Sequence, residues 1–349
     1  MKLSEQGIFN KNVANKLKGI AAIGVVCSHV LSSKSYFILK YFTKGYLWVG
    51  VFFFLSGYGL AYSSKTKDNY MTNFIFKKFV QIYLPFVIAQ AIYLVIVNYY
   101  INKIPFKMLD LICVAGIGVV NPVLWYILEI LVIYTIFFII KKYFMFKQED
   151  IIWCFLTFVI ILVLLTLDII FDIGSWWYTA TSVYFFGYVI GNHDEEASAD
   201  KGIYNLVSLV FFSQNIFVWL VKCIIFFILI WMDINPEIWL QGEASNYVNY
   251  ILIVLYIVEV PIFLSLVEYI CRYISEKRNI VSFLGNISYE IYLVHMIVKN
   301  ISDKLCDSYS ISYIEEIIFI FGFTFVFAYI FHIINNRLKF ILYKNSTSK

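Results

Sequence analysis

The sequence predicts an all-α fold, a polytopic bundle of about ten transmembrane helices that forms one membrane-embedded domain over residues 1–349. Hydrophobic residues make up 61% of the chain, and the mean hydropathy is +0.79. Charged residues make up 14%, whereas a soluble globular protein carries about 25%. The apolar residues also fall into long runs. This composition excludes a soluble enzyme, a disordered chain and a nucleic-acid binder as the main interpretation.

Ten apolar runs are candidate spans, because a helix needs roughly 18 or more mostly apolar residues to cross a bilayer. In order along the chain they are 18–35, 44–62, 80–101, 119–140, 150–167, 176–191, 203–231, 247–271, 280–300 and 313–334. The run 203–231 is too long for one simple span, so an interfacial helix followed by a span is an alternative for it. The apolar stretch 109–120 is short and suggests a re-entrant segment. Gly187 and Gly191 form one small-xxx-small step, which favours close packing of helices.

The basic residues predict how the bundle is oriented. With the N-terminus inside, an even number of spans places both termini in the cytoplasm, and most of the 27 Lys and Arg residues then lie on that side. The segments 168–175 and 233–246 face outward in this arrangement, and their charged residues are all acidic. The acidic segment 193–200 is an exception, since it faces inward. We therefore expect a multi-pass protein of the cytoplasmic membrane, in contact with the lipid bilayer.

The spacing of the cysteines and histidines predicts no metal site. The six cysteines include no C-x-x-C pair and no zinc-binding spacing. His193 lies beside acidic residues in a polar stretch, a pattern more typical of a solvated loop than of a metal site. We therefore expect no metal cofactor.

Ionisable side chains at membrane depth are candidate functional residues, because each costs several kcal/mol in the bilayer. The candidates that we select from the predicted spans are His29, Glu129, Lys222, Glu259, Glu290, His295 and His332. Of these, we treat His295 as structural or pore-lining. His332 lies near the inner end of the last span, where facing the headgroups is an alternative.

His29 is the most informative of these residues because of its spacing from Lys18. Eleven residues turn a helix to within about 20° of three full turns, so both side chains face the same way, about 16 Å apart along the axis. Lys18 would then lie at the cytoplasmic edge and His29 deep in the bundle. This arrangement suits a donor that enters from the cytoplasm and reacts inside the bundle. The structural alternative is a buried, hydrogen-bonded imidazole beside a lysine that reaches the interface.

Five short motifs follow one another along the chain. They are KGIAAIGVVCSHV at 18–30, GVFFFLSGY at 50–58, FKKFVQIYLP at 76–85, LWYI at 124–127 and LGNISYEIYLVH at 284–295. In this order they resemble the membrane acyltransferase-3 family, and the resemblance covers nearly the whole chain. Proteins of this family acylate carbohydrate and envelope acceptors, commonly with acetyl groups from acetyl-CoA. The resemblance therefore implies an integral-membrane O-acetyltransferase with an acyl-CoA donor, acetyl-CoA, and a glycan or lipid-linked sugar acceptor.

The resemblance also assigns roles to residues of this chain. The basic residue and the essential histidine of the family's first span correspond to Lys18 and His29. The family's Arg-x-x-Arg motif, which handles the acyl donor at the start of the third span, corresponds to Lys78 and Gln81. Lys78 keeps the positive charge of the family's first arginine, whereas Gln81 is neutral where the family has its second arginine. Lys77 adds a neighbouring cation, so we expect Lys18, Lys77 and Lys78 to hold the phosphates of the donor.

Two chemical roles for His29 stay open at this point. It acts either as the base that takes the proton of the acceptor hydroxyl, or as a transient carrier of the acyl group. Glu129, one helical turn after Trp125, either orients His29 or lines the acceptor path; a structural hydrogen bond is the alternative. Ser56 and Gly57 favour close packing rather than catalysis.

Two other functions also remain open. A transporter or exporter without covalent chemistry would also account for the intramembrane charges, although no paired broken spans support it. The neutral Gln81 makes an inactive member of the family a further alternative.

Overall fold

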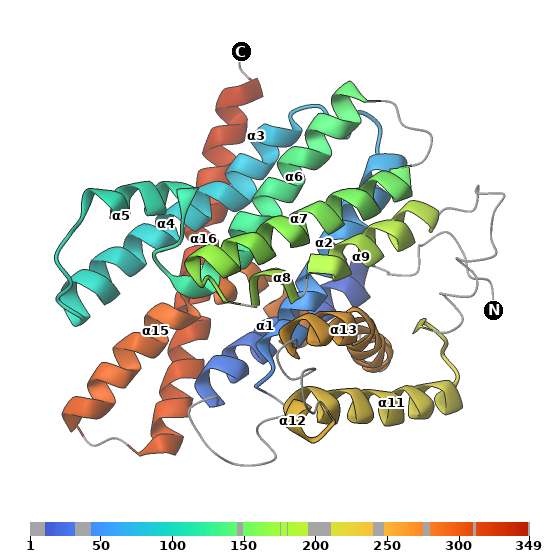
Figure 1. Ribbon diagram of the computed structural model, residues 1–349. Coiled ribbons are helices and arrows are strands. Elements are labelled where there is room, and N and C mark those ends of the chain that lie inside the picture. The colour runs from blue at the N-terminus through green and yellow to red at the C-terminus, as the bar shows by residue number, and fades with distance from the viewer. Residues whose placement is uncertain are drawn as a thin grey trace. The chain divides into compact units, whose positions relative to one another are not determined.

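The computed structural model describes residues 11–31, 43–144, 149–174, 176–179, 181–194, 211–239, 248–274, 280–309 and 312–347. Every regular element in these ranges is a helix (Figure 1). The chain divides into two compact units. The first comprises Met1–Asp68 and Phe146–Asn286, and the second comprises Asn69–Met145 and Ile287–Lys349.

The first unit is a bundle of helices, five of which share an apolar core. Its elements are α1 (Lys11–Leu31), α2 (Gly45–Thr66), α7 (Glu149–Phe171), α8 (Trp176–Thr179), α9 (Thr181–His193), α11 (Ile216–Ile234), α12 (Pro236–Trp239), α13 (Val248–Tyr273) and α14 (Ile280–Asn286). Buried side chains from five of these helices share the core, among them Leu17, Phe54, Ile190, Ile230 and Leu264. Because lipid is as apolar as these side chains, close packing rather than exclusion of water holds such helices together.

Helices α2 and α9 pack backbone to backbone through glycines. A Cβ atom on Gly57 would lie 2.1 Å from the carbonyl oxygen of Tyr184, and one on Gly187 would lie 2.2 Å from that of Phe54. Gly191 makes the same kind of contact one turn further along. Any side chain at these positions would force the helices apart. The predicted packing role of Gly57 and of the small-xxx-small step is therefore confirmed.

Helix α1 is fixed by close contacts along its length. A Cβ atom on Gly19 would lie 2.3 Å from the carbonyl oxygen of Val281 on α14, and one on Gly24 would lie 2.0 Å from the ring of Trp48 on α2. The side-chain amide of Asn15 also donates to the carbonyl oxygen of Ser282, at 2.8 Å. These contacts hold α1 at defined heights against two neighbouring helices.

The second unit contains helices with irregular turns. Its elements are α3 (Phe74–Lys78), η2 (Phe79–Tyr83), α4 (Leu84–Tyr93), η3 (Leu94–Ile101), α5 (Met108–Ile112), η4 (Cys113–Ile117), η5 (Pro122–Leu124), α6 (Trp125–Tyr143), α15 (Ser288–Tyr309) and α16 (Tyr313–Thr347). The turns η2, η3 and η4 are π-helical. The turn η2 ends just before Pro85, which has no N–H to donate and would clash with the carbonyl group four residues earlier in a regular helix. The wider π turn relieves this conflict without ending the helix.

The short apolar stretch predicted at 109–120 is helical and then breaks. It forms α5 and η4, and Gly116 near its end has a φ of 96° that a residue with a side chain rarely adopts. The Tyr83 hydroxyl donates to the carbonyl oxygen of Ala115, at 2.7 Å, which ties the stretch to η2. The break separates it from α6, as expected of a segment distinct from the next span. A re-entrant path through the membrane stays a prediction.

Seven helices of the described chain are long and apolar enough to cross a membrane, or eight if the bent pair α14 and α15 counts as one. The two helices of that pair meet at an angle of 81°. Each of the ten predicted runs holds a helix, but neither α1 nor α9 is among these candidates. The chain is therefore a multi-pass membrane protein, while the count of about ten and the cytoplasmic position of the termini stay predictions.

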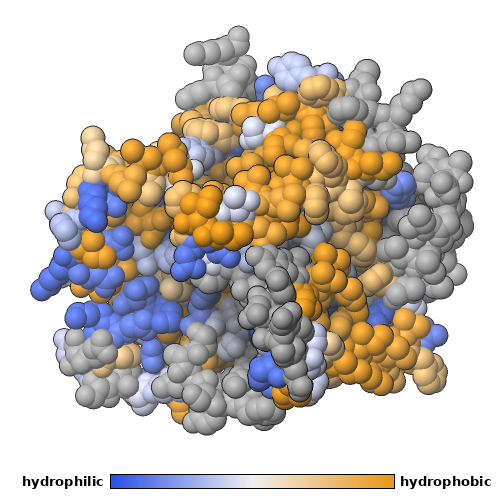
Figure 2. Space-filling model, viewed as in Figure 1, coloured by the Kyte–Doolittle hydropathy of each residue, from blue (hydrophilic) through white to orange (hydrophobic). Residues whose placement is uncertain are grey.

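The surface of these helices suits a lipid environment. Apolar residues cover much of the face that Figure 2 shows. On α11, Phe217 and Phe227 are 73% and 63% exposed, although both are large apolar side chains. This helix begins at Ile216, inside the run predicted at 203–231. Residues 203–210, where the alternative places an interfacial helix, lie outside the described residues.

Candidate active site

One continuous helix, α1, carries both Lys18 and His29. The predicted helical spacing therefore holds, and the two side chains project from the same face, about 16 Å apart along the axis. Lys18 is exposed and His29 is half-buried. Among the described residues, no carboxylate pairs with the Lys18 ammonium. Lys18 thus has the exposure that binding to an anionic ligand requires.

A neighbouring lysine on α1 has a structural role that sequence reasoning missed. Lys16 is only 2% exposed, and its ammonium donates to the carbonyl oxygens of Cys271 and Ile274, at 3.3 and 2.6 Å. These carbonyls lie at the C-terminal end of α13, where the helix dipole favours a cation. Two lysines of similar sequence context therefore differ in role. Only burial, which sequence does not specify, separates them.

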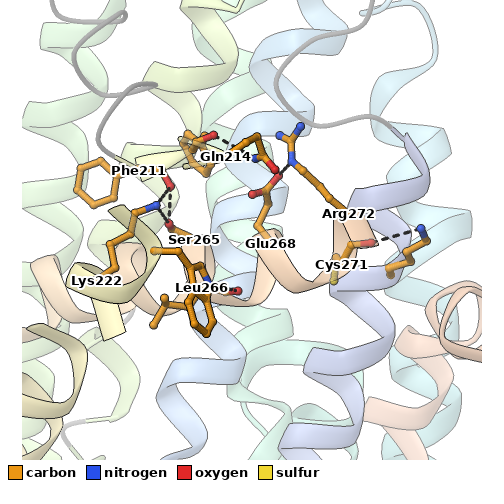
Figure 3. A network of polar contacts seen from close by, with 11 residues as sticks. Phe211, Gln214, Lys222, Ser265, Leu266, Glu268, Cys271 and Arg272 are labelled. Atoms are coloured by element: carbon orange, nitrogen blue, oxygen red, sulfur yellow. Dashed lines mark hydrogen bonds and ion pairs between the residues drawn. The ribbon is translucent and has the colours of Figure 1, made fainter. Parts of the chain in front are cut away.

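The predicted candidate Lys222 also has a structural role. Its ammonium donates to Ser265 Oγ and to the carbonyl oxygen of Phe211, each at 2.7 Å (Figure 3). On the same face of α13, the buried carboxylate of Glu268 accepts a hydrogen bond from the guanidinium of Arg272. Lys222 and Glu268 therefore have polar partners inside the first unit. This network joins α11 to α13.

The start of the third predicted span lies in the second unit, on α3 and η2. Lys77 is exposed. The Lys78 ammonium lies over two aromatic rings, 5.3 Å from the centroid of Phe74 and 4.2 Å from that of Tyr134. Such cation–π contacts hold a lysine side chain in one direction. Because Tyr134 belongs to α6, the contact also joins the start of this span to α6.

Gln81 occupies the position where the family's second arginine is expected. Its side-chain amide donates to the hydroxyl of Tyr343 on α16, at 3.3 Å. Gln81 is exposed, so this contact leaves it accessible. An amide supplies neither the charge nor the planar fork with which arginine binds phosphate.

Glu129 lies inside the second unit. It is 5% exposed and follows the buried Trp125 by one turn of α6. The start of α6 is held by α15, because the Tyr292 hydroxyl donates to the carbonyl oxygen of Val123. The structure therefore places Glu129 on a fixed and buried surface. Its predicted link with His29 lies between the two units and stays a prediction.

The C-terminal motif contains a polar cluster that sequence reasoning did not assemble. Glu290 Oε1 lies 3.2 Å from His332 Nδ1 and accepts a hydrogen bond from the Asn335 amide at 3.1 Å. Glu290 and His332, which the sequence gives as separate candidates, therefore form a contact between α15 and α16. His295 Nδ1 lies 2.8 Å from the carbonyl oxygen of Tyr292, and its side chain is buried. That contact supports the structural interpretation of His295.

The predicted site residues thus form two groups. Lys18 and His29 lie on α1 in the first unit, whereas Lys77, Lys78, Gln81 and Glu129 lie on α3, η2 and α6 in the second. Within the described residues, no three His, Cys, Asp or Glu side chains gather as a metal site.

Comparison with known families identifies the kind of domain. The sequence profile of a family described as an acyltransferase domain matches residues 15–333. Searches of curated proteins and of solved structures found no match. The matched range includes α1 and the start of α3.

Proposed function

The chain belongs to the acyltransferase-3 family, a family of membrane acyltransferases, and we propose that it is an O-acetyltransferase of the cytoplasmic membrane. In this proposal it moves an acetyl group from acetyl-CoA to a hydroxyl of a glycan or a lipid-linked sugar precursor. The observation that carries the proposal is the placement of Lys18 and His29 on one face of one helix. A cation and a base at fixed spacing suit a donor with phosphates at one end and a thioester at the other.

The proposed chemistry begins with the acceptor. A sugar hydroxyl is a poor nucleophile at neutral pH, and a neutral imidazole is suited to take its proton. As His29 takes the proton, the hydroxyl oxygen bonds to the thioester carbonyl carbon. The bond from carbon to sulfur then breaks, and coenzyme A leaves as a thiolate that takes the proton from His29, which returns to its neutral form. In the alternative route, an imidazole nitrogen of His29 bonds to the acetyl carbon while the bond from carbon to sulfur breaks and coenzyme A leaves as a thiolate. The acceptor hydroxyl then takes the acetyl group from this nitrogen, and the hydroxyl proton goes to the released imidazole.

The donor needs cations for its phosphates. Lys18 and Lys77 are exposed, and Lys78 is held in place by two aromatic rings. These three lysines are the proposed contacts of the donor, and Gln81 is a neutral neighbour of theirs in sequence. Glu129, buried and fixed on α6, is the proposed residue that orients His29 or lines the acceptor path.

A label-transfer experiment tests the proposal. Membranes that contain the protein are incubated with acetyl-labelled acetyl-CoA, and base-labile label is followed into glycan and lipid-linked fractions. We expect label with the native chain and none with His29→Ala at equal expression. Cys27→Ala, a small change on the same helix, is the matched control and should keep full transfer. Equal label with His29→Ala would refute the role of His29. Absence of label with the native chain, in membranes that hold the natural acceptor, would contradict acetyl transfer.

A further inference from the structure

A buried pair of carboxyl groups in the first unit has too few hydrogens for its hydrogen bonds. Asp233 lies in the last turn of α11 and is 4% exposed, and Glu259 in α13 is fully buried. The hydroxyl oxygen of Tyr46, in the first turn of α2, lies 3.1 Å from Asp233 Oδ2 and 2.9 Å from Glu259 Oε2. Each of these oxygen pairs needs a hydrogen atom between its members. The phenol supplies only one.

The second hydrogen belongs to one of the carboxyl groups, and the surroundings show which one. Asp233 is 2.5 Å from the ammonium of Lys44 and accepts a hydrogen bond from the Tyr256 hydroxyl at 2.7 Å. An adjacent cation and a second donor favour the ionised form of Asp233. Glu259 has neither. In the described part of the chain, its other oxygen, Oε1, has no hydrogen-bond partner.

The balance of charge leads to the same assignment. Lys44 is the one cation in contact with the pair among the described residues, so two ionised carboxylates would leave a buried negative charge. An ionised carboxylate with an unpartnered oxygen in a dry interior carries a large desolvation cost. A proton on Glu259 Oε2 removes this charge and supplies the missing hydrogen. The hydrogen bonds then run from Glu259 to Tyr46 and from Tyr46 to Asp233.

This chain of hydrogen bonds includes the first turn of α2, which lies against the helix that carries His29. Tyr46 follows Gly45, and a Cβ atom on Gly45 would lie 3.2 Å from Ser28 Oγ. Ser28 directly precedes His29 on α1. The first turn of α2 therefore lies against the last turns of α1. The hydrogen bonds that hold Tyr46 therefore also hold the first turn of α2, against which the turn of α1 that contains His29 packs.

We propose that Glu259 is held in its protonated form and acts as a positioning residue for His29, through Tyr46 and the first turn of α2. The positioning role rests on the proposed acetyl transfer, whereas the protonation does not. Glu268, on the same helix, gives the contrast. Its buried carboxylate is paired with the guanidinium of Arg272, a cation that favours the ionised form.

Infrared difference spectroscopy of the purified full-length protein tests the protonation. The spectrum of the native chain minus that of Glu259→Gln should contain the carbonyl band of a neutral carboxyl group, and the band should shift in D2O. The matched difference for Glu268→Gln should contain a carboxylate band instead. If the Glu259 difference also showed only a carboxylate band, the proposal would be wrong. This result does not depend on activity or on the acceptor.

The positioning role is tested by acetyl transfer with two variants. Glutamine has the shape and the neutrality of a protonated glutamate, so Glu259→Gln should keep most of the native kcat. Glu259→Leu removes the hydrogen bond to Tyr46, and a displacement of about 1 Å at the His29 turn can lower kcat by about 100-fold. The KM for acetyl-CoA should stay unchanged in both. A loss as large with glutamine as with leucine would overturn the positioning role. Failure of the native chain to transfer acetyl would instead refute the proposed function, while the infrared result would still decide the protonation.

Discussion

At the scale of single residues, environment separates side chains that look alike in the sequence. Lys16 and Lys18 are two positions apart on α1, yet Lys16 is buried on the carbonyls that end α13 and Lys18 is exposed. Glu259 and Glu268 are both buried but differ in their partners, because Glu268 forms a salt bridge with Arg272 and Glu259 contacts the hydroxyl of Tyr46. Sequence reasoning finds some of the charged residues in apolar surroundings, such as Lys222 and Glu259, and misses others, such as Glu268. It does not find the partner that turns one of them into a structural contact.

The exposure of Lys18 leads to a prediction about the donor. Lys18→Ala should raise the KM for acetyl-CoA by about tenfold, because a hydrogen bond to a charged group contributes about 1.5 kcal/mol. Lys11→Ala removes another exposed lysine from the start of the same helix and should leave KM unchanged. Steady-state kinetics at saturating acceptor separates KM from kcat. Equal KM values for both variants would remove Lys18 from the donor site.

The neutral residue in the donor motif leads to a second prediction. Gln81→Arg should lower the KM for acetyl-CoA several-fold, because a guanidinium binds phosphate through two parallel hydrogen bonds. Gln81→Ala loses only the exposed contact with Tyr343 and should leave KM close to the native value. The same kinetic measurement serves as the readout. If arginine did not improve KM, position 81 would lie too far from the bound phosphates to contact them.

At the scale of helices, the apolar runs predict where helices occur, and the small residues predict where two helices pack closely. Each predicted apolar run contains a helix, and the small-xxx-small step at Gly187 and Gly191 marks a close contact with α2. The break between α14 and α15 and the π turn before Pro85 were not predicted. Hydropathy averages over a run and does not report its direction. The hydropathy profile therefore does not predict the bend of 81° between α14 and α15.

Two glycines of α2 test how much the close helix contact contributes to stability. A Cβ atom on Gly57 would lie 2.1 Å from the carbonyl oxygen of Tyr184, so Gly57→Ala should destabilise the protein by about 1–3 kcal/mol, the usual cost of overpacking. Gly59, two positions away, has nothing within 4 Å of such a Cβ atom. Gly59→Ala should therefore be neutral or stabilising, since alanine favours the helix by up to about 1 kcal/mol. Thermal unfolding in detergent compares the two, and equal midpoints would contradict the packing argument.

At the scale of the whole molecule, the relative directions of neighbouring helices limit how many times the chain can cross the membrane. In the first unit, α2 and α9 run parallel, because Gly57 lies beside Tyr184 and Tyr188 and the turn at Gly191 lies beside Tyr58. Helices α1 and α2 run antiparallel, since Ser28 lies beside Gly45 and Gly24 beside Trp48. A chain that crosses the membrane at each of the ten predicted runs requires both relations, because α2 and α9 are then its second and sixth spans. Neither α1 nor α9 is among the clear candidates, because lysines lower the hydropathy of α1 and the described α9 is only 13 residues long.

The predicted topology is tested by the side on which exposed positions react. In a variant whose six native cysteines are replaced, single cysteines are placed at the exposed positions Lys67, Lys103 and Asp172 and treated with a membrane-impermeant maleimide. With ten crossings and cytoplasmic termini, intact cells should label the cysteines at 103 and 172, and the cysteine at 67 should react only after permeabilisation. If the N-terminus were cytoplasmic but neither α1 nor α9 crossed the membrane, the pattern at all three positions would invert. The inverted result would also mean that α1, which carries Lys18 and His29, does not cross the membrane. The proposed path of the donor from the cytoplasm to His29 would then be wrong.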